Sequence, residues 1–138
     1  MELRFAHLAD FATVDASNKP TLVGIFDRVM CTSPVPPILF PGFHLVATFE
    51  ASISEGAEHQ LEIAFVNDDE KIVGPKFDGP LVFRTAGVGH KAQASAIIAF
   101  LPNAIQVEDP GDYYFRFRVD EVEHGRARVS VIPVQPMG

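Results

Sequence analysis

A strict two-residue alternation that begins at Tyr113 constrains the fold more than any other feature of the sequence. Apolar side chains take one side of this segment, and the other side carries Tyr114, Arg116, Arg118 and Asp120. Such alternation predicts a β-strand with one face against a core and the other in water. After a turn predicted at Asp120–Gly125 the alternation resumes. The two segments predict a last hairpin whose inward rows are Tyr113, Phe115, Phe117 and Val119 on one strand and Ala127, Val129 and Val131 on the other.

The residues that lead into this hairpin are similar to a tyrosine corner. The pattern is Asp109-x-Gly111-x-Tyr113. In the corner of immunoglobulin-like sandwiches, a tyrosine hydroxyl donates a hydrogen bond to backbone slightly upstream. The disulfide cysteine that would follow in antibody domains is absent, and Phe115 stands in its place. The resemblance implies that Tyr113 makes such a bond.

The remaining segments alternate in the same way between turn residues. Strands are predicted at 3–14, 21–31, 43–50 and 60–65, with a short edge strand at 77–84 and another strand from Ala92 to Ile98. For 3–14 a helix is the alternative, because its apolar residues also recur at helical spacing. With the last hairpin this makes about eight or nine strands, separated by turn signals every ~8–12 residues. We predict an all-β fold, an immunoglobulin-like or jelly-roll β-sandwich, as a single domain over residues 1–138.

The net charge and the cysteine count indicate which partners and which cell compartment to expect for this protein. The 138 residues carry a formal net charge of −7. This charge repels phosphate backbones and anionic membranes, so neither nucleic acid nor a membrane is an expected partner. Cys31 is the only cysteine, as suits a reducing cytosol. The sequence shows no signal peptide and no apolar run near the ~20 residues of a membrane span, so we expect a cytoplasmic protein.

The predicted strand 21–31 contains two charged residues, and its alternation does not show which of them faces water. Asp27 and Arg28 fall on opposite sides of a strand whose sides both look buried. Either one charge faces inward, or Gly24 carries a bulge that shifts the register. We favour a structural ion pair, or a carboxylate bonded to loop N–H groups, because an unpaired buried carboxylate is costly. The functional alternative is a pocket at a buried polar cluster of Asp10, Asp27 and Arg28.

Two further segments carry short motifs. Four prolines in Thr32–Gly42 remove ladder donors, so this segment is predicted to cross between sheets in extended form. Its Pro34-x-x-Pro37 pattern would also fit an aromatic groove. The Gly87-x-Gly89 pair lacks the third glycine and the helix of a phosphate-binding loop, so Thr85–His90 is predicted to be a plain loop.

The most informative surface is electrostatic. From Glu50 to Asp78 there are eight acids and two lysines, a net charge of −6. The candidate interaction face, which we call the arginine face, is the outer side of the last hairpin. If Arg118 lies opposite Arg126, like charges meet directly. We favour neutralisation by Glu62 on the adjoining strand, and the functional alternative is an anionic partner or the acidic surface of a second copy. The arginine face comprises Tyr114, Arg116, Arg118, Arg126 and Arg128.

No local pattern indicates catalysis or a metal site. Zinc sites need close ligand spacings, which are absent among His7, His44, His59, His90 and His124. A site assembled only in three dimensions stays open. The run Asp68-Asp69-Glu70 lacks the calcium-loop signature and is predicted to be a solvated turn. There is no G-x-S-x-G elbow, and Cys31 has no local basic neighbour. We predict no catalytic residues, no metal and no cofactor.

Four segments stand in a distinctive order along the chain: Leu8–Ala12, Val23–Arg28, Phe40–Val46 and Pro110–Tyr113. Together they cover nearly its whole length. They resemble a family of small bacterial proteins that is catalogued only as a domain of unknown function. The last turn of that family usually tightens to an Asp-Gly pair, whereas Asp120–Gly125 is longer. The resemblance implies a sandwich fold and a bacterial cytoplasmic source, and it supplies no activity and no site residues.

We therefore expect a non-enzymatic binding or assembly module that uses a sheet face and end loops. Its partner is expected to be a protein or a second copy, giving a homodimer. The alternative is a small-ligand- or metal-binding sandwich with a polar site near Asp10, Asp27 and Arg28, and a hydrolase is the third choice. On the leading view, Arg116→Glu leaves folding almost unchanged and weakens the oligomer.

Overall fold

The structure, a computed structural model, describes residues 1–16, 19–31, 35–84 and 91–134. Within these ranges the single helical segment is a short 3-10 turn, η1 (Ile53–Glu55), and no described helix could cross a membrane. The all-β prediction is confirmed, as is strand rather than helix for the first segment. The strands are β1 (Glu2–Val14), β2 (Pro20–Phe26), β3 (Arg28–Cys31), β4 (Ile38–Leu39), β5 (Phe43–Ser52), β6 (Glu58–Asn67), β7 (Ile72–Val82), β8 (Lys91–Phe100), β9 (Gln106–Val107), β10 (Gly111–Val119) and β11 (Val122–Pro133).

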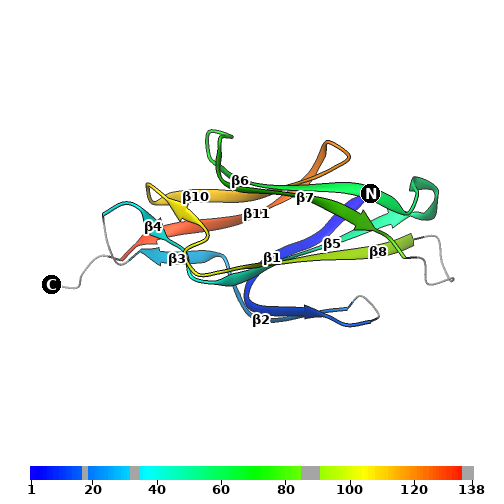
Figure 1. The fold of residues 1–138 in the computed structure, drawn as a ribbon, viewed down its shortest axis with the longest axis horizontal. Helices are drawn as coiled ribbons and strands as arrows, with labels where there is room; N and C mark the ends of the chain where they lie inside the picture. The colour runs from blue at the N-terminus through cyan, green and yellow to red at the C-terminus, as the bar shows by residue number, and fades with distance from the viewer. Residues whose placement is uncertain (17–18, 32–34, 85–90, 135–138) are drawn as a thin grey trace.

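Two main sheets face each other across the core, as Figure 1 shows. One sheet has four strands in the order β2-β1-β5-β8, and the other has five in the order β3-β11-β10-β6-β7. Neighbouring strands are antiparallel except β3 and β11, which run parallel. The described part of the proline-rich segment contains β4, which pairs with β9. The finer choice between immunoglobulin-like and jelly-roll topology stays a prediction.

Phenylalanine rings fill the space between the two sheets. The rings of Phe43 and Phe115 have centroids 5.9 Å apart, and those of Phe49 and Phe117 have centroids 6.1 Å apart, both in edge-on contacts. Each fully buried side chain of this size stabilises the fold by roughly 1.5–3 kcal/mol before entropy is counted. All seven inward residues predicted for the last hairpin are buried. The alternation therefore predicted the core face of this hairpin correctly.

The last hairpin turns more tightly than predicted. β10 ends at Val119 and β11 begins at Val122, so the turn is Asp120-Glu121 rather than Asp120–Gly125. Both turn residues have positive φ, 50° and 69°, as in the mirror-image turns of two-residue hairpins. The Asp120 N–H donates to the Gln60 carbonyl oxygen at 2.9 Å. This contact with β6 holds the turn, and the sequence around Asp120 gives no sign of it.

The tyrosine corner is present where β10 begins. The Tyr113 hydroxyl donates to the carbonyl oxygen of Asp109 at 2.6 Å. Burial raises the pKa of this hydroxyl, so it remains a donor at neutral pH. The bond holds the segment from Asp109 to Tyr113 at the start of β10. It thereby helps to direct the inward side chains of β10 toward the core.

The predicted strand 21–31 is in fact two strands in different sheets. β2 pairs with β1, whereas β3 pairs in parallel with β11. The chain changes sheets at Asp27, whose carbonyl oxygen accepts a hydrogen bond from the Ser130 N–H at 2.8 Å. Gly24 has a φ of 70°, yet the pairing of β1 with β2 keeps one register past it. The alternation failed here because the residues before and after Asp27 belong to different sheets, which face the same core from opposite sides.

β1 is shared between two neighbours. Its residues from Glu2 to Ala9 pair with β5, and those from Leu8 to Val14 pair with β2. The β1–β2 hairpin therefore extends away from β5 and β8, and Figure 1 shows it below the rest of the sheet. This arrangement leaves the outer face of the four-stranded sheet bent.

Candidate functional site

The predicted arginine face lies on the outer side of the five-stranded sheet. Tyr114, Arg116 and Arg118 come from β10, and Arg126 and Arg128 come from β11. The pairing of Arg118 with Arg126 that we considered does not occur: Arg116 lies opposite Arg126, so two like charges do meet, and Arg118 lies opposite Glu123. A bulge next to Gly125 shifts the register at this point. The structure thus brings the five residues together, and their role as an interaction face stays a prediction.

Carboxylates of the same chain surround these arginines. Glu62 on β6 lies 3.7 Å from Arg116, 3.9 Å from Arg118 and 3.5 Å from Lys76. Arg126 donates hydrogen bonds of 2.9 and 2.6 Å to Glu70 and one of 3.0 Å to Glu123. The bonds from Arg126 lower the pKa of the Glu70 carboxyl. The neutralisation favoured from the sequence is present, and Glu70 and Glu123 extend it.

The outer side of the five-stranded sheet has no surplus of positive charge. Its carboxylates belong to Glu58, Glu62, Glu70, Asp78, Asp112 and Glu123, and its cations to Arg28, Lys76 and the four arginines of the arginine face, so six minus six is zero. Among the described residues, Arg128 is the one arginine of this face without a carboxylate within 4.0 Å. A neutral surface attracts an anionic partner weakly.

Arg116 belongs to the interior rather than to an open surface. It is 7% exposed, and its Nε is buried without a hydrogen-bond partner in the part of the chain that the structure describes. Above it, the Arg126 guanidinium carbon lies 5.7 Å from the centre of the Tyr114 ring. Arg116 is therefore held under its neighbours and is not free to meet a partner.

Asp10, Asp27 and Arg28 do not form a buried polar cluster, so that prediction is wrong. The side chains of Asp27 and Arg28 are 66% and 70% exposed, with charged atoms 3.8 Å apart. The sheet change at Asp27 turns both charges toward water. The Asp10 carboxylate lies over β2, in the space that a side chain at Gly24 would occupy.

Two surface cavities divide these three residues between them. Asp10 and Arg28 line a cavity of about 480 Å³ whose walls also include Phe26, Met30 and Leu39. Asp27 lines a second cavity, of about 470 Å³, between β1 and β11. The first combines two opposite charges with apolar walls, and the second runs along a strand edge.

The described histidines and acids form no metal centre. No group of three or more His, Cys, Asp or Glu side chains within the described ranges could hold an ion. Glu70 binds Arg126, and the side-chain oxygen of Asn67 accepts from the N–H groups of Asp69 and Lys71, as expected of a closed turn. The Gly87-x-Gly89 pair, His90 and Pro34 lie outside the described residues.

The outer face of the four-stranded sheet is apolar, and sequence reasoning missed it. Phe11 on β1 lies opposite Val23 on β2, and Ile25 follows on the same side. These three side chains are 51%, 56% and 59% exposed. We call this surface the apolar face. The register assigns to it Phe5, His7, Ala9, Phe11, Val23, Ile25, His44, Val46, Thr48, Ser95, Ile97 and Ala99.

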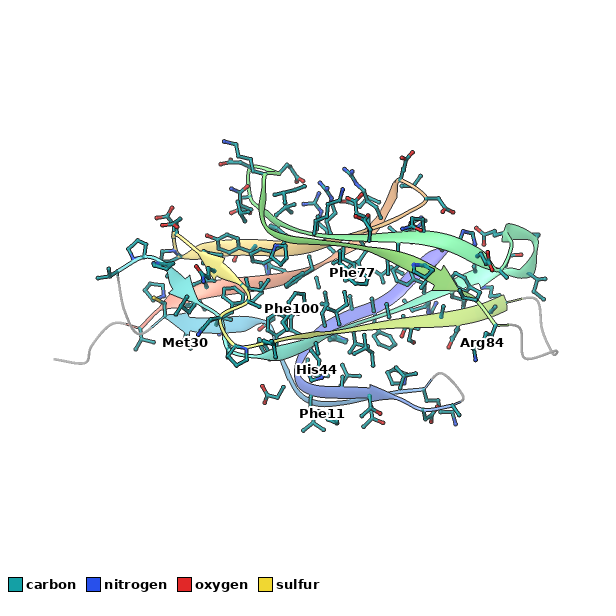
Figure 2. The ribbon with its side chains drawn as sticks, in the orientation of Figure 1. Phe11, Met30, His44, Phe77, Arg84 and Phe100 are labelled. Atoms are coloured by element: carbon teal, nitrogen blue, oxygen red, sulfur yellow. The ribbon has the colours of Figure 1, made fainter. Side chains whose placement is uncertain are left out.

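Figure 2 shows Phe11 and His44 directed into the same space between the β1–β2 hairpin and β5. Their rings are 5.4 Å apart in an edge-on contact. The Nδ1 atom of His44 is buried and has no partner among the residues the structure describes. The apolar face contains no Asp, Glu, Lys or Arg side chain, and the ion pair of Lys91 with Glu50 lies beyond it. It is thus the uncharged counterpart of the arginine face.

Comparison with known proteins adds a family and one solved structure. Residues 4–132 match a family described as a family of unknown function (DUF6941). No curated protein matches the sequence. Among solved structures, the chain is similar to Pseudomonas fluorescens alkylpurine DNA glycosylase AlkC bound to DNA containing an abasic site analog, with a TM-score of 0.40 and 11% identity. The similarity covers 92% of this chain and 30% of that one.

Proposed function

The chain belongs to this family of unknown function, and we propose that it is a non-enzymatic assembly module that pairs with a second copy through the apolar face. The observation that carries the proposal is the exposure of Phe11, Val23 and Ile25 side by side. Contiguous apolar patches on a protein surface mark interaction sites, because covering them removes apolar area from water.

The charges favour a second copy as the partner. In a two-fold interface each patch meets its own copy, so a charged patch would meet like charge. The apolar face has no charged side chain, so two copies can approach although each carries a net charge of −7. A partner of opposite charge would instead be held by charged groups on the face.

The open part of the apolar face is small. Ala9 and Val46 are fully buried and Thr48 is 3% exposed, so the surface that a partner can reach is centred on Phe11, Val23 and Ile25 of the β1–β2 hairpin. We therefore expect a weak dimer, because stable interfaces bury on the order of 1,000 Å² or more.

Packing by the face is favoured over pairing by the edge of β2. The carboxylate of Asp10 lies over Gly24 at the middle of this edge strand, and Gly24 itself has positive φ. A charge and an irregular backbone are the devices that keep an edge from accepting another strand. The apolar side chains on the adjacent face have no such protection.

Light scattering at several protein concentrations tests the proposal. We expect the mass to rise from that of the 15.1 kDa chain toward twice that value with concentration. Val23→Lys should keep the protein monomeric, because each copy would bury an unpaired ammonium group. The control is Val122→Lys, at a similarly exposed residue that begins β11. A mass that stays monomeric throughout, or equal behaviour of the two variants, would refute self-assembly through this face.

A second candidate function is binding of a small amphiphile in the cavity of about 480 Å³, because Asp10 and Arg28 place opposite charges on one apolar cavity. Chemical-shift changes of Met30 on titration with a zwitterionic detergent would support it. An unchanged Met30 signal would refute binding in this cavity.

We also propose a bacterial cytoplasmic setting. The single cysteine, Cys31, is buried, and the acidic surface suits a protein that meets neither nucleic acid nor anionic lipid. Fractionation of cells that carry the tagged chain would test the location.

A further inference from the structure

The outer edge of β11 is only partly paired. β11 runs from Val122 to Pro133, but β3 covers only the residues from Ser130 to Pro133. No other described strand pairs with that side of β11. The gap exists because the residues before Asp27 form β2, which belongs to the other sheet, so β3 begins only at Arg28. We propose that this edge accepts a short extended segment of another protein that carries one acidic side chain.

The backbone of the open stretch is oriented to receive a strand. The Ser130 N–H donates toward β3, to the Asp27 carbonyl oxygen. Backbone groups of alternate residues point to the same side of a strand, so the N–H and C=O groups of Arg126 and Arg128 point to the same edge. These groups have no ladder partner among the described residues. An added strand would continue the line of β3 and supply the missing bonds.

A groove lies along this stretch and gives the segment room. The cavity of about 470 Å³ is lined by Ala6 and Leu8 of β1, by Phe26 and by Ala127. β1 pairs with β2 only from Leu8 onward, so the opposite wall is not closed by β2. Alternate side chains of an added strand would meet the apolar floor, and the others would lie beside the arginines.

The charges at the groove select the chemistry of the segment. Arg126 is engaged by Glu70 and Glu123, whereas Arg128 is exposed and has no carboxylate within 4.0 Å among the described residues. One guanidinium is therefore left to bind a carboxylate. Asp27 lines the same groove, and the chain carries −7 overall, so a run of acids would be repelled. A single acidic residue among small apolar ones fits best.

This proposal can be tested separately from the dimer. The groove and the apolar face share His7 and Ile25, but Arg128 and the edge of β11 belong to the five-stranded sheet, and Val23 does not line the groove. Arg128→Glu should therefore leave the mass in solution unchanged, and Val23→Lys should leave peptide binding unchanged. The two experiments can fail separately.

A capped peptide tests the edge directly. The probe alternates valine with threonine and has one glutamate in place of its central threonine. We expect saturable binding to the intact protein, measured by fluorescence anisotropy, and a loss of about tenfold or more in Arg128→Glu. The same peptide with lysine in place of glutamate should bind the Arg128→Glu variant more tightly than the wild type. Arg4→Glu, at an exposed arginine of β1, is the matched control and should bind like the wild type.

A backbone-methylated peptide separates strand addition from charge attraction. Methyl groups on alternate amides remove the donors that an added strand needs, so this peptide should not bind. Equal binding of the methylated and unmethylated peptides would overturn the proposal. It would also be overturned by equal affinity of the wild type and Arg128→Glu, or by no binding at millimolar peptide.

Discussion

The imidazole of His59 lies between two oxygen atoms. Its Nδ1 is 2.6 Å from Oδ2 of Asp120, and its Nε2 is 3.0 Å from the carbonyl oxygen of Gly56. Both oxygens are acceptors, so only the protonated ring, with two N–H donors, satisfies both. The bond to Asp120 is the main cause that raises the pKa of His59. The Asp120 carboxyl has a lowered pKa, first because it accepts from the Gln60 N–H and then because of His59.

This contact predicts a fall in stability at alkaline pH. A pKa that is higher in the folded state means that the stabilisation is complete below about 6.5, the unfolded value for histidine. It is lost as pH rises through the raised pKa of the folded protein. The free energy of unfolding, measured with urea between about pH 6 and pH 9, should therefore decrease for the wild type. His59→Gln should remove this part of the slope, and His124→Gln should keep it. An identical slope in all three proteins would contradict the prediction.

The tyrosine corner predicts a modest cost for one lost hydroxyl. Tyr113→Phe removes the 2.6 Å bond to Asp109 and leaves a carbonyl without its donor. We expect a loss of about 1 kcal/mol or slightly more in the free energy of unfolding. Tyr114→Phe, on the outer side of the same strand, is the matched control and should cost less. Equal costs would mean that the corner bond does not stabilise the fold.

The core predicts a large cost for removing one ring. Phe117 is fully buried and contacts Phe49 across the two sheets. Phe117→Ala should lower the free energy of unfolding by ~3–5 kcal/mol, because it removes apolar contacts and leaves a cavity. Phe77→Ala, at a partly exposed ring on edge strand β7, should cost about 0.5 kcal/mol or somewhat more. Similar costs at both positions would place Phe117 outside the core.

The burial of Arg116 reverses an expectation drawn from the sequence. Arg116→Glu would place a second carboxylate beside Glu62, at a position that is almost closed to water. We now expect a loss of about 3–5 kcal/mol rather than an almost neutral change. Arg118→Glu, at a more open position of the same strand, should be milder. Denaturant unfolding of the two variants would decide, and an unaffected Arg116→Glu protein would contradict the buried position.

The inward row of β10 could be predicted because a strand with one core face leaves a period-two signal. Phe115 and Phe117 alternate with arginines, and no tertiary information is needed to assign them. The pattern also located the neutralising Glu62, since neighbouring strands bring opposite charges together. Arg116, however, is covered by its neighbours, and its sequence surroundings match those of an exposed arginine.

Three features could not be predicted, each for a physical reason. The turn at Asp120 depends on a contact with Gln60 from β6, which is distant in sequence. The sheet change at Asp27 leaves alternation on both sides, and alternation does not say which sheet a strand joins. The apolar face was missed because Val23 and Ile25 give the same signal whether they face a core or water.

Site-specific photo-crosslinking tests the apolar-face dimer most directly. A photoreactive phenylalanine would replace Val23, and the crosslinked peptides would be identified by mass spectrometry after irradiation at a concentration where the dimer forms. We expect crosslinks between copies that join position 23 to the apolar face, at segments around Phe11, His44 or Ile97. Crosslinks directed to the opposite sheet around Arg118, or no covalent dimer at all, would contradict assembly through this face.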